Sequence, residues 1–249
     1  MHSYKNGIIY IATTNGQNPL VYIKSAIESA RSVLNMCPNL GRHIYTDKNG
    51  LEQIDKLTDS PFSSTGEIVN PHYRSKVDYI SQTPYERTLY IDSDTRIVAD
   101  ISEMFDLLDR FDLALAHAHN RNKHKKDNSG KFIEKIPESF PQYNGGVILY
   151  KNSDEVRHFL MEWADSFYQA GFYKDQITLR WLLYNTKLRL ATLPPEYNIR
   201  FKKYLKVWNN KEASPKILHF KKFHQGNFLF QTIRFFIRII SWIKRKAGL

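Results

Sequence analysis

Two carboxylates stand one residue apart, at Asp92 and Asp94, directly after the apolar residues 89–91. Like charges this close repel each other, so the pair is costly unless a cation or hydrogen-bond donors compensate it. Mg²⁺ and Mn²⁺ do so readily, because they prefer carboxylate oxygens and leave positions open for phosphate oxygens. Alternate residues of an extended chain point to one side, so both carboxylates would face the same cation. The pair predicts a metal site, and the alternative is a solvated turn capped by Ser93 and Asp94.

Short apolar runs and helical periodicity indicate the elements that must position these acids. The runs predict strands at 7–14, 42–47, 88–92, 112–118 and 146–151. The periodicity predicts helices at 19–36, 73–81, 156–170 and 176–185. Strands that alternate with helices indicate an α/β fold with a largely parallel central sheet, in which ligands bind beyond the carboxyl ends of the strands. We therefore expect one crevice to collect the polar residues that follow strands, which are Thr13, Asp47, the acid pair and His117.

The composition is that of a folded protein. The 249 residues are 42% hydrophobic and 14% aromatic, which suffices for a substantial core and argues against global disorder. The only cysteine, Cys37, allows no internal disulfide, so a reducing compartment is expected. The apolar run at 7–12 is too short for a signal peptide, and no run of 18 apolar residues predicts a membrane-spanning helix.

The formal net charge of +11 is concentrated at the end of the chain. Residues 200–249 hold 13 Lys and Arg against one acid, whereas residues 1–199 hold 23 against 24. This distribution argues against a uniformly basic nucleic-acid-binding protein, and we predict no nucleic-acid partner. Residues 228–249 carry five Lys and Arg, no acid, and apolar residues at helical spacing. They predict a basic amphipathic helix on an anionic membrane surface, with packing on the core or another subunit as the alternative.

Five segments stand in a recognisable order along the chain. They are RTLYIDSDTRIVADI (87–101), YNGGVILYK (143–151), YKDQITL (173–179), LPPEYNIR (193–200) and KILHF (216–220). Together they resemble the GT-A-fold nucleotide-sugar glycosyltransferases of the family 8 type, retaining enzymes related to glycogenin and bacterial lipooligosaccharide galactosyltransferases. The resemblance implies a GT-A catalytic domain over residues 1–227, with a Rossmann-like, mostly parallel sheet flanked by helices. Residues 228–249 would then be a separate membrane-interface helix.

The resemblance also implies a metal centre. Asp92, Asp94 and His219 would hold Mn²⁺ or Mg²⁺ against the diphosphate of a nucleotide-sugar donor, with a UDP-sugar as the first expectation. A packed, hydrogen-bonded histidine is the alternative for His219. The family's Lys-Pro-Trp sequence after this histidine is absent here. The phosphate contact that its lysine would make therefore has three candidate residues, which are Lys221, Lys222 and His224.

Further donor contacts follow from the same resemblance. The base, ribose, diphosphate and sugar would meet Ala12, Thr13, Thr14, Arg74, Lys76, Ser93 and Gly145. The reacting face of the sugar would meet Asn144, Asp175 and Gln176, which we predict to be catalytic. Purely structural roles stay open for these residues. The threonines and Asp175 could be helix caps, Arg74 and Lys76 could be exposed helix charges, and the glycines could form a tight turn. The charged segment at 120–131 is either a surface loop or a loop that borders the site.

The predicted activity is metal-dependent transfer of a sugar to a hydroxyl of a glycan or lipid-linked acceptor. The resemblance implies retention of configuration, but the residues show no unambiguous general base, so inversion stays open. The transfer would take place at the cytoplasmic face of the membrane, in the synthesis of cell-surface polysaccharide or glycolipid; the oligomeric state is open. One rival is a sugar-phosphate nucleotidyltransferase, but ATTNGQNP (12–19) is poor in the glycines and basic residues of a phosphate loop. A second rival is an inactive surface-binding protein, against which the intact acids and His219 argue.

Overall fold

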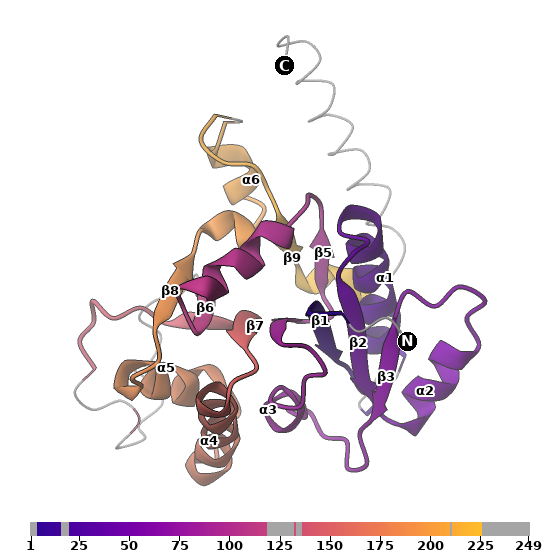
Figure 1. Cartoon of the computed structure of the whole chain (residues 1–249), viewed down its shortest axis with the longest axis horizontal. Helices are drawn as coiled ribbons and strands as arrows, with labels where there is room; N and C mark the ends of the chain where they lie inside the picture. The colour runs from indigo at the N-terminus through magenta and orange to yellow at the C-terminus, as the bar shows by residue number, and fades with distance from the viewer. Residues whose placement is uncertain (1–3, 16–19, 119–131, 133–135, 210, 226–249) are drawn as a thin grey trace.

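The computed structural model describes residues 4–15, 20–118, 132, 136–209 and 211–225. Its centre is a seven-stranded sheet in the order β3-β2-β1-β4-β7-β6-β8, with helices on both faces (Figure 1). Its strands are β1 (Asn6–Ile11), β2 (Gly41–Thr46), β3 (Ser64–Glu67), β4 (Arg87–Ile91), β6 (Leu113–His117), β7 (Tyr143–Lys151) and β8 (Leu190–Leu193). β7 runs antiparallel to β4 and β6, and the other pairings in this sheet are parallel, so the predicted α/β fold is confirmed.

The helices are α1 (Val21–Met36), α2 (Lys48–Asp55), α3 (Lys76–Tyr79), α4 (Asp154–Ala170), α5 (Gln176–Asn185) and α6 (Tyr204–Val207). The described part of the chain also holds the 3₁₀ segments η1 (Ser102–Asp109), η4 (Pro195–Tyr197) and η5 (Lys221–Gln225). α4 begins after Ser153, whose hydroxyl accepts from the Val156 N–H, and ends at Gly171, whose φ of 64° favours glycine.

The predicted helix at 73–81 is shorter than expected. Residues 73–75 form a turn instead, because Ser75 Oγ accepts from the His72 N–H and donates to the His72 C=O, both at 2.8 Å. Arg74 therefore lies in this turn and Lys76 is the first residue of α3.

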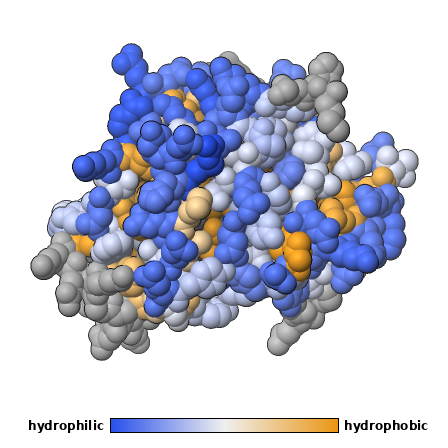
Figure 2. Space-filling view, turned by 60° about the horizontal axis from the view of Figure 1, so that its bottom comes forward, coloured by the Kyte–Doolittle hydropathy of each residue, from blue (hydrophilic) through white to orange (hydrophobic). Residues whose placement is uncertain are grey.

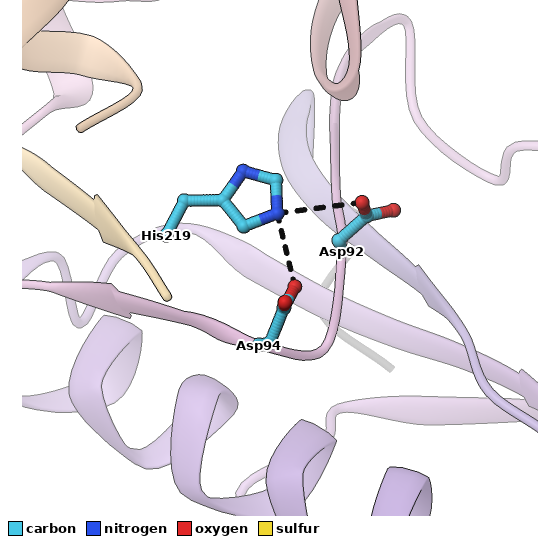
Figure 3. A group of neighbouring side chains, drawn as sticks. All are labelled: Asp92, Asp94 and His219. Carbon is cyan, nitrogen blue, oxygen red and sulfur yellow. Dashed lines mark ion pairs between the residues drawn. The ribbon is translucent and has the colours of Figure 1, made fainter. Parts of the chain in front are cut away.

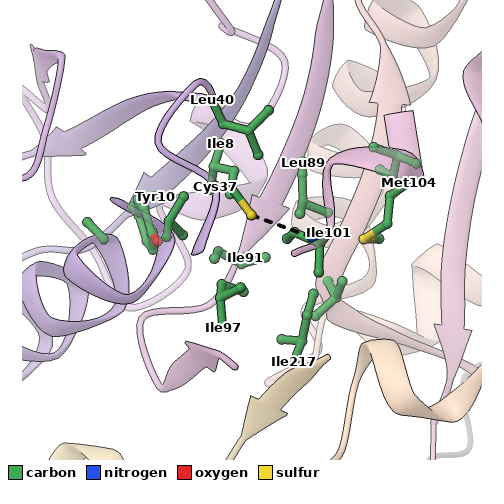
Figure 4. Close-up of a cluster of buried hydrophobic side chains, with 14 of the residues drawn as sticks. Ile8, Tyr10, Cys37, Leu40, Leu89, Ile91, Ile97, Ile101, Met104 and Ile217 are labelled. Carbon is green, nitrogen blue, oxygen red and sulfur yellow. Dashed lines mark hydrogen bonds between the residues drawn. The ribbon is translucent and has the colours of Figure 1, made fainter. Parts of the chain in front are cut away.

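Alternate side chains of the central strands supply two cores, one on each face of the sheet. Ile8 and Ile91 belong to the core that lies under α1 and η1 (Figure 4). The neighbouring Ile9 and Tyr90 belong to the core beneath α4, where Trp163 is fully buried. Because both faces are covered, β4 is buried from Thr88 onward and apolar from Leu89 to Ile91, directly before the acid pair.

A small second sheet lies directly after the acid pair and brings the end of the chain's last described strand beside it. β5 (Thr95–Ile97) pairs antiparallel with β9 (Ile217–His219), with Thr95 opposite His219. The Phe220 N–H also donates to the Asp94 C=O at 3.0 Å. These backbone bonds bring His219 beside Asp94, although the two residues are distant in the sequence.

The face drawn in Figure 2 is largely hydrophilic, and apolar side chains reach it in separate patches. No helix among the described residues is both long and apolar enough to cross a membrane. The predicted basic helix at 228–249 and the charged segment at 120–131 lie outside the described residues. The boundary between residues 227 and 228 therefore stays a prediction.

Candidate active site

Asp92, Asp94 and His219 converge just beyond the end of β4 (Figure 3). Nε2 of His219 lies 2.9 Å from Oδ1 of Asp94 and 3.4 Å from Oδ2 of Asp92. Each residue offers one ligand atom, and these atoms all lie within 4.8 Å of one another. His219 and Asp94 are buried, while Asp92 is half-buried. The three residues predicted to be metal ligands are therefore gathered in one place.

A relay of hydrogen bonds orients the imidazole. The Gly146 N–H donates to Oδ1 of Asn144 at 3.1 Å, and Nδ2 of Asn198 donates to the same oxygen at 3.0 Å. This fixes Oδ1 of Asn198 toward Nδ1 of His219, 2.8 Å away, so Nδ1–H must be the donor. Nε2 is then the nitrogen turned toward the carboxylates, as in metal sites where a second partner orients the ligating histidine.

The charges around Nε2 call for a cation. Burial opposes ionisation of Asp92, but the Lys76 ammonium and His219 outweigh it and hold the pKa of Asp92 below its usual range. Burial would likewise lower the pKa of His219, yet Asp94 and Asp92 raise it. A neutral Nε2 would present a lone pair to two carboxylates, an arrangement that a proton or a metal ion between them would make favourable. Two carboxylates and an imidazole therefore fit a divalent cation.

Gly146 makes the convergence possible. A Cβ atom there would lie 2.3 Å from Oδ2 of Asp92 and 2.4 Å from Cε1 of His219, far inside any normal contact. The neighbouring Gly145 is less confined, with the Lys76 ammonium 3.4 Å away as the nearest atom. Gly146 is thus the glycine whose missing side chain lets Asp92 and His219 approach the strand. The sequence resemblance instead indicates Gly145 as the donor-binding glycine.

A second charge cluster lies around Asp175, whose side chain makes no capping hydrogen bond to α5. Oδ2 of Asp175 lies 2.5 Å from Nζ of Lys76, and Oδ1 lies 3.4 Å from the Arg74 guanidinium. Nζ of Lys76 also donates to the Gly145 C=O at 3.2 Å. Burial disfavours the Lys76 charge, but Asp175 and Asp92 more than offset it and raise its pKa. Asp175 therefore stands at the N-cap position of α5, but its carboxylate pairs with Lys76 instead of capping the helix, and Lys76 is not an exposed helix charge.

A cleft of about 530 Å³ opens beside both clusters. The predicted site residues that line it are Ala12, Thr13, Arg74, Lys76, Asp92, Ser93, Asp94, Asn144, Asp175 and Gln176. Gly145 and His219 do not line the cleft but contact residues that do. The Gly145 C=O accepts a hydrogen bond from Lys76, and His219 contacts Asp94. Lys222 is exposed and does not line the cleft, whereas the other two candidates for the phosphate contact, Lys221 and His224, do.

Thr14 and Asp47 support the loop after β1 and do not line the cleft. The Thr14 N–H and hydroxyl both donate to Oδ2 of Asp47, at 2.9 and 2.8 Å. Oδ1 of Asp47 accepts from the Gly50 N–H and caps α2. His117 is also absent from the lining, and its ring contacts Tyr143. The expected crevice therefore collects only part of the strand-end polar set.

Several cleft residues are not among the predicted site residues. The rings of Tyr73 and Tyr173 stack 5.2 Å apart at the cleft, and the Arg74 guanidinium lies 4.4 Å from the Tyr73 ring. Arg200 and Lys174 also line it. Tyr173, Lys174 and Arg200 belong to two of the five segments and Tyr73 to the predicted helix at 73–81, but neither the segments nor the periodicity assigned them a role.

A larger hollow of about 890 Å³ lies elsewhere, along α4 and the end of α5. Asp112 at its edge is held by Arg189 and Lys151. None of its lining residues belongs to the metal cluster or to the Asp175 cluster. The smaller cleft is therefore the candidate active site.

The central sheet with helices on both faces has the fold termed GT-A. Three solved glycosyltransferases share it over 86% of this chain. The galactosyltransferase LgtC, in complex with donor and acceptor sugar analogs, aligns over 87% of its own chain with a TM-score of 0.61 and 15% identity. GlyE of Streptococcus pneumoniae TIGR4 aligns over 55% (TM-score 0.58, 18% identity), and mouse xyloside xylosyltransferase 1 over 97% (0.55, 13%). No sequence-family model and no curated protein sequence matches the chain. The likeness establishes the fold.

Proposed function

We propose that this protein is a glycosyltransferase that moves a sugar from a nucleoside-diphosphate donor to a hydroxyl acceptor. The observation that carries the proposal is the convergence of Asp92, Asp94 and His219 at a cleft, on a fold shared with solved glycosyltransferases. The Lys76–Asp175 pair lines the same cleft, with side chains only 12% and 4% exposed. This pair supports a sugar-binding site at the other end of the cleft from the metal cluster. A UDP-sugar is the first donor to test.

Asp92, Asp94 and His219 would hold Mn²⁺ or Mg²⁺, and the imidazole ligand favours Mn²⁺ of the two. When bound, such a cation stabilises the negative charge that builds on a leaving nucleoside diphosphate. Ala12, Thr13 and Ser93 line the cleft where base and ribose would lie. Arg74 suits the diphosphate and sugar, because its planar fork binds phosphate oxygens in pairs.

The sugar end would be formed by Asp175, Gln176 and Asn144. Lys76 and Arg74 hold the Asp175 carboxylate in one orientation, from which it can accept hydrogen bonds from sugar hydroxyls. A solved variant of LgtC carries glutamate in place of an active-site glutamine. We propose the same part for Gln176, which lines the cleft beside Asp175. The acceptor hydroxyl would attack the anomeric carbon with retention of configuration.

We further propose that the acceptor is a glycan or a lipid-linked sugar at the cytoplasmic face of a membrane. The support is the basic segment 228–249, whose charge and apolar spacing suit an anionic lipid surface.

A donor panel tests the activity. UDP-, GDP- and ADP-sugars are each added with Mn²⁺, and hydrolysis and thermal stabilisation are measured. One nucleotide sugar should stabilise the protein and be slowly hydrolysed, and chelation of Mn²⁺ should abolish both effects. Turnover of a nucleoside triphosphate with a sugar 1-phosphate would instead identify a nucleotidyltransferase. A protein that binds no nucleotide sugar would be an inactive relative.

A further inference from the structure

Arg200 borders the cleft directly beside the metal cluster. Its Nη1 lies 2.5 Å from Nε2 and 3.2 Å from Nδ1 of His219. The backbone holds this neighbourhood together, because the Ile199 N–H donates to the Ile217 C=O and the His219 N–H donates to the Ile199 C=O, both at 2.9 Å. The place of Arg200 is therefore set by β9, next to the proposed ligand.

The cations of the cleft differ in their partners. Arg74 and Lys76 are both paired with Asp175, while Lys174 and Lys221 are exposed. Arg200 is half-buried, and no Asp or Glu among the described residues forms an ion pair with it. A guanidinium in this position lacks the anion that its planar donors fit best.

The same guanidinium opposes a cation at the cluster. The arginine side chain is a cation with five N–H donors and no acceptor. Nη1 touches the nitrogen of His219 that faces Asp92 and Asp94, so a metal ion on that nitrogen would stand within a few ångströms of a fixed positive charge. Two positive charges repel at this range, so Arg200 offsets part of the attraction that Asp92 and Asp94 exert on a cation, and a bound anion would relieve that repulsion.

We propose that Arg200 couples the two ligands of the cleft: it disfavours a divalent cation bound alone and binds the diphosphate once the cation is present. This inference rests on the proposed function. Coupling of this kind is reciprocal, so the diphosphate raises the affinity for the cation by the same factor that the cation raises the affinity for the diphosphate. Arg200 would make the cation and the diphosphate bind together.

The test compares wild type with Arg200→Gln, Arg200→Lys and the matched control Lys202→Gln, which removes one charge from an exposed position outside the cleft lining. Calorimetry measures Mn²⁺ alone, and then the nucleoside diphosphate that binds wild type best, at saturating Mn²⁺. Arg200→Gln should bind Mn²⁺ alone several-fold tighter and the diphosphate about tenfold weaker, the usual effect of losing a charge-assisted hydrogen bond. Arg200→Lys should keep the wild-type Mn²⁺ affinity and bind the diphosphate with intermediate affinity. Lys202→Gln should match wild type in both.

Arg200→Gln is expected to change the affinities for Mn²⁺ and for the diphosphate in opposite directions, which distinguishes coupling from general damage to the site. If Arg200→Gln weakens Mn²⁺ and diphosphate together, Arg200 merely supports His219 and the inference is wrong. Unchanged affinities for both ligands overturn it equally. If wild type binds neither Mn²⁺ nor any nucleoside diphosphate, it is the proposed function that fails. Thermal unfolding of each variant confirms that the comparison is between folded proteins.

Discussion

Gly146→Ala tests the geometry of the metal cluster most sharply. The added Cβ would lie 2.3 Å from Oδ2 of Asp92 and 2.4 Å from Cε1 of His219, whereas ordinary contact begins at 3.4 Å. Relief therefore requires a displacement of about 1 Å, in a site where ligand distances must hold to about 0.2 Å. We expect Mn²⁺ affinity to fall at least ~10-fold and the free energy of unfolding to fall by about 1–3 kcal/mol, as for overpacked cores.

Gly145→Ala is the matched control on the same strand. Its Cβ would meet the Lys76 ammonium at 3.4 Å and Oδ2 of Asp175 at 3.6 Å, both ordinary contacts. Neither glycine has a positive φ, so backbone strain does not separate the two variants. Calorimetric titration with Mn²⁺ and urea unfolding should show Gly145→Ala close to wild type in Mn²⁺ affinity. Wild-type Mn²⁺ affinity and stability in Gly146→Ala would refute the reasoning.

Three further predictions concern the relay, a buried histidine and the basic segment. Asn198→Ala removes the acceptor of the His219 Nδ1–H, so Mn²⁺ affinity should fall by about 10–100-fold with little loss of fold; an unchanged titration would contradict the relay. Burial lowers the pKa of His43 from 6.5 to about 4. Between these two pKa values His43 is protonated in the unfolded chain and neutral in the folded protein. The free energy of unfolding should therefore drop by about 2–3 kcal/mol between pH 7 and pH 4.5. Urea unfolding of His43→Gln at both pH values should show a smaller drop, and an equal drop would remove His43 as its cause. Deletion of residues 228–249 should abolish co-sedimentation with anionic liposomes, whereas equal binding by both forms would reject the membrane proposal.

The strongly patterned elements were predictable because packing decides them. The inward residues of α4, including Val156, Leu160 and Trp163, are fully buried, in agreement with the periodicity at 156–170. The weakly patterned elements were missed. β3 is the polar edge strand Ser64–Glu67, whose exposed side chains carry no apolar alternation. α2 is set by the Asp47 cap rather than by a long apolar face, and the sequence cannot reveal that β7 runs antiparallel.

The site was predictable where a motif joins distant segments. The order of the acid pair, the Asp-Gln segment and the late histidine indicated Asp92, Asp94, Asp175 and His219 together. Arg200 ends one of the five segments but was given no role, because its place beside His219 is created by the pairing of Ile199 with β9. Which of the two neighbouring site glycines, Gly145 or Gly146, must lack a Cβ could not be decided without coordinates.

The most direct test of the central claim compares wild type with Asp94→Asn. This substitution keeps the shape of the side chain and removes the charge that faces Nε2 of His219 at 2.9 Å. The account predicts that wild type hydrolyses one nucleotide sugar in the presence of Mn²⁺, and that folded Asp94→Asn loses Mn²⁺ binding and at least ~100-fold of that turnover. Full Mn²⁺-dependent turnover in the folded Asp94→Asn variant would contradict the account.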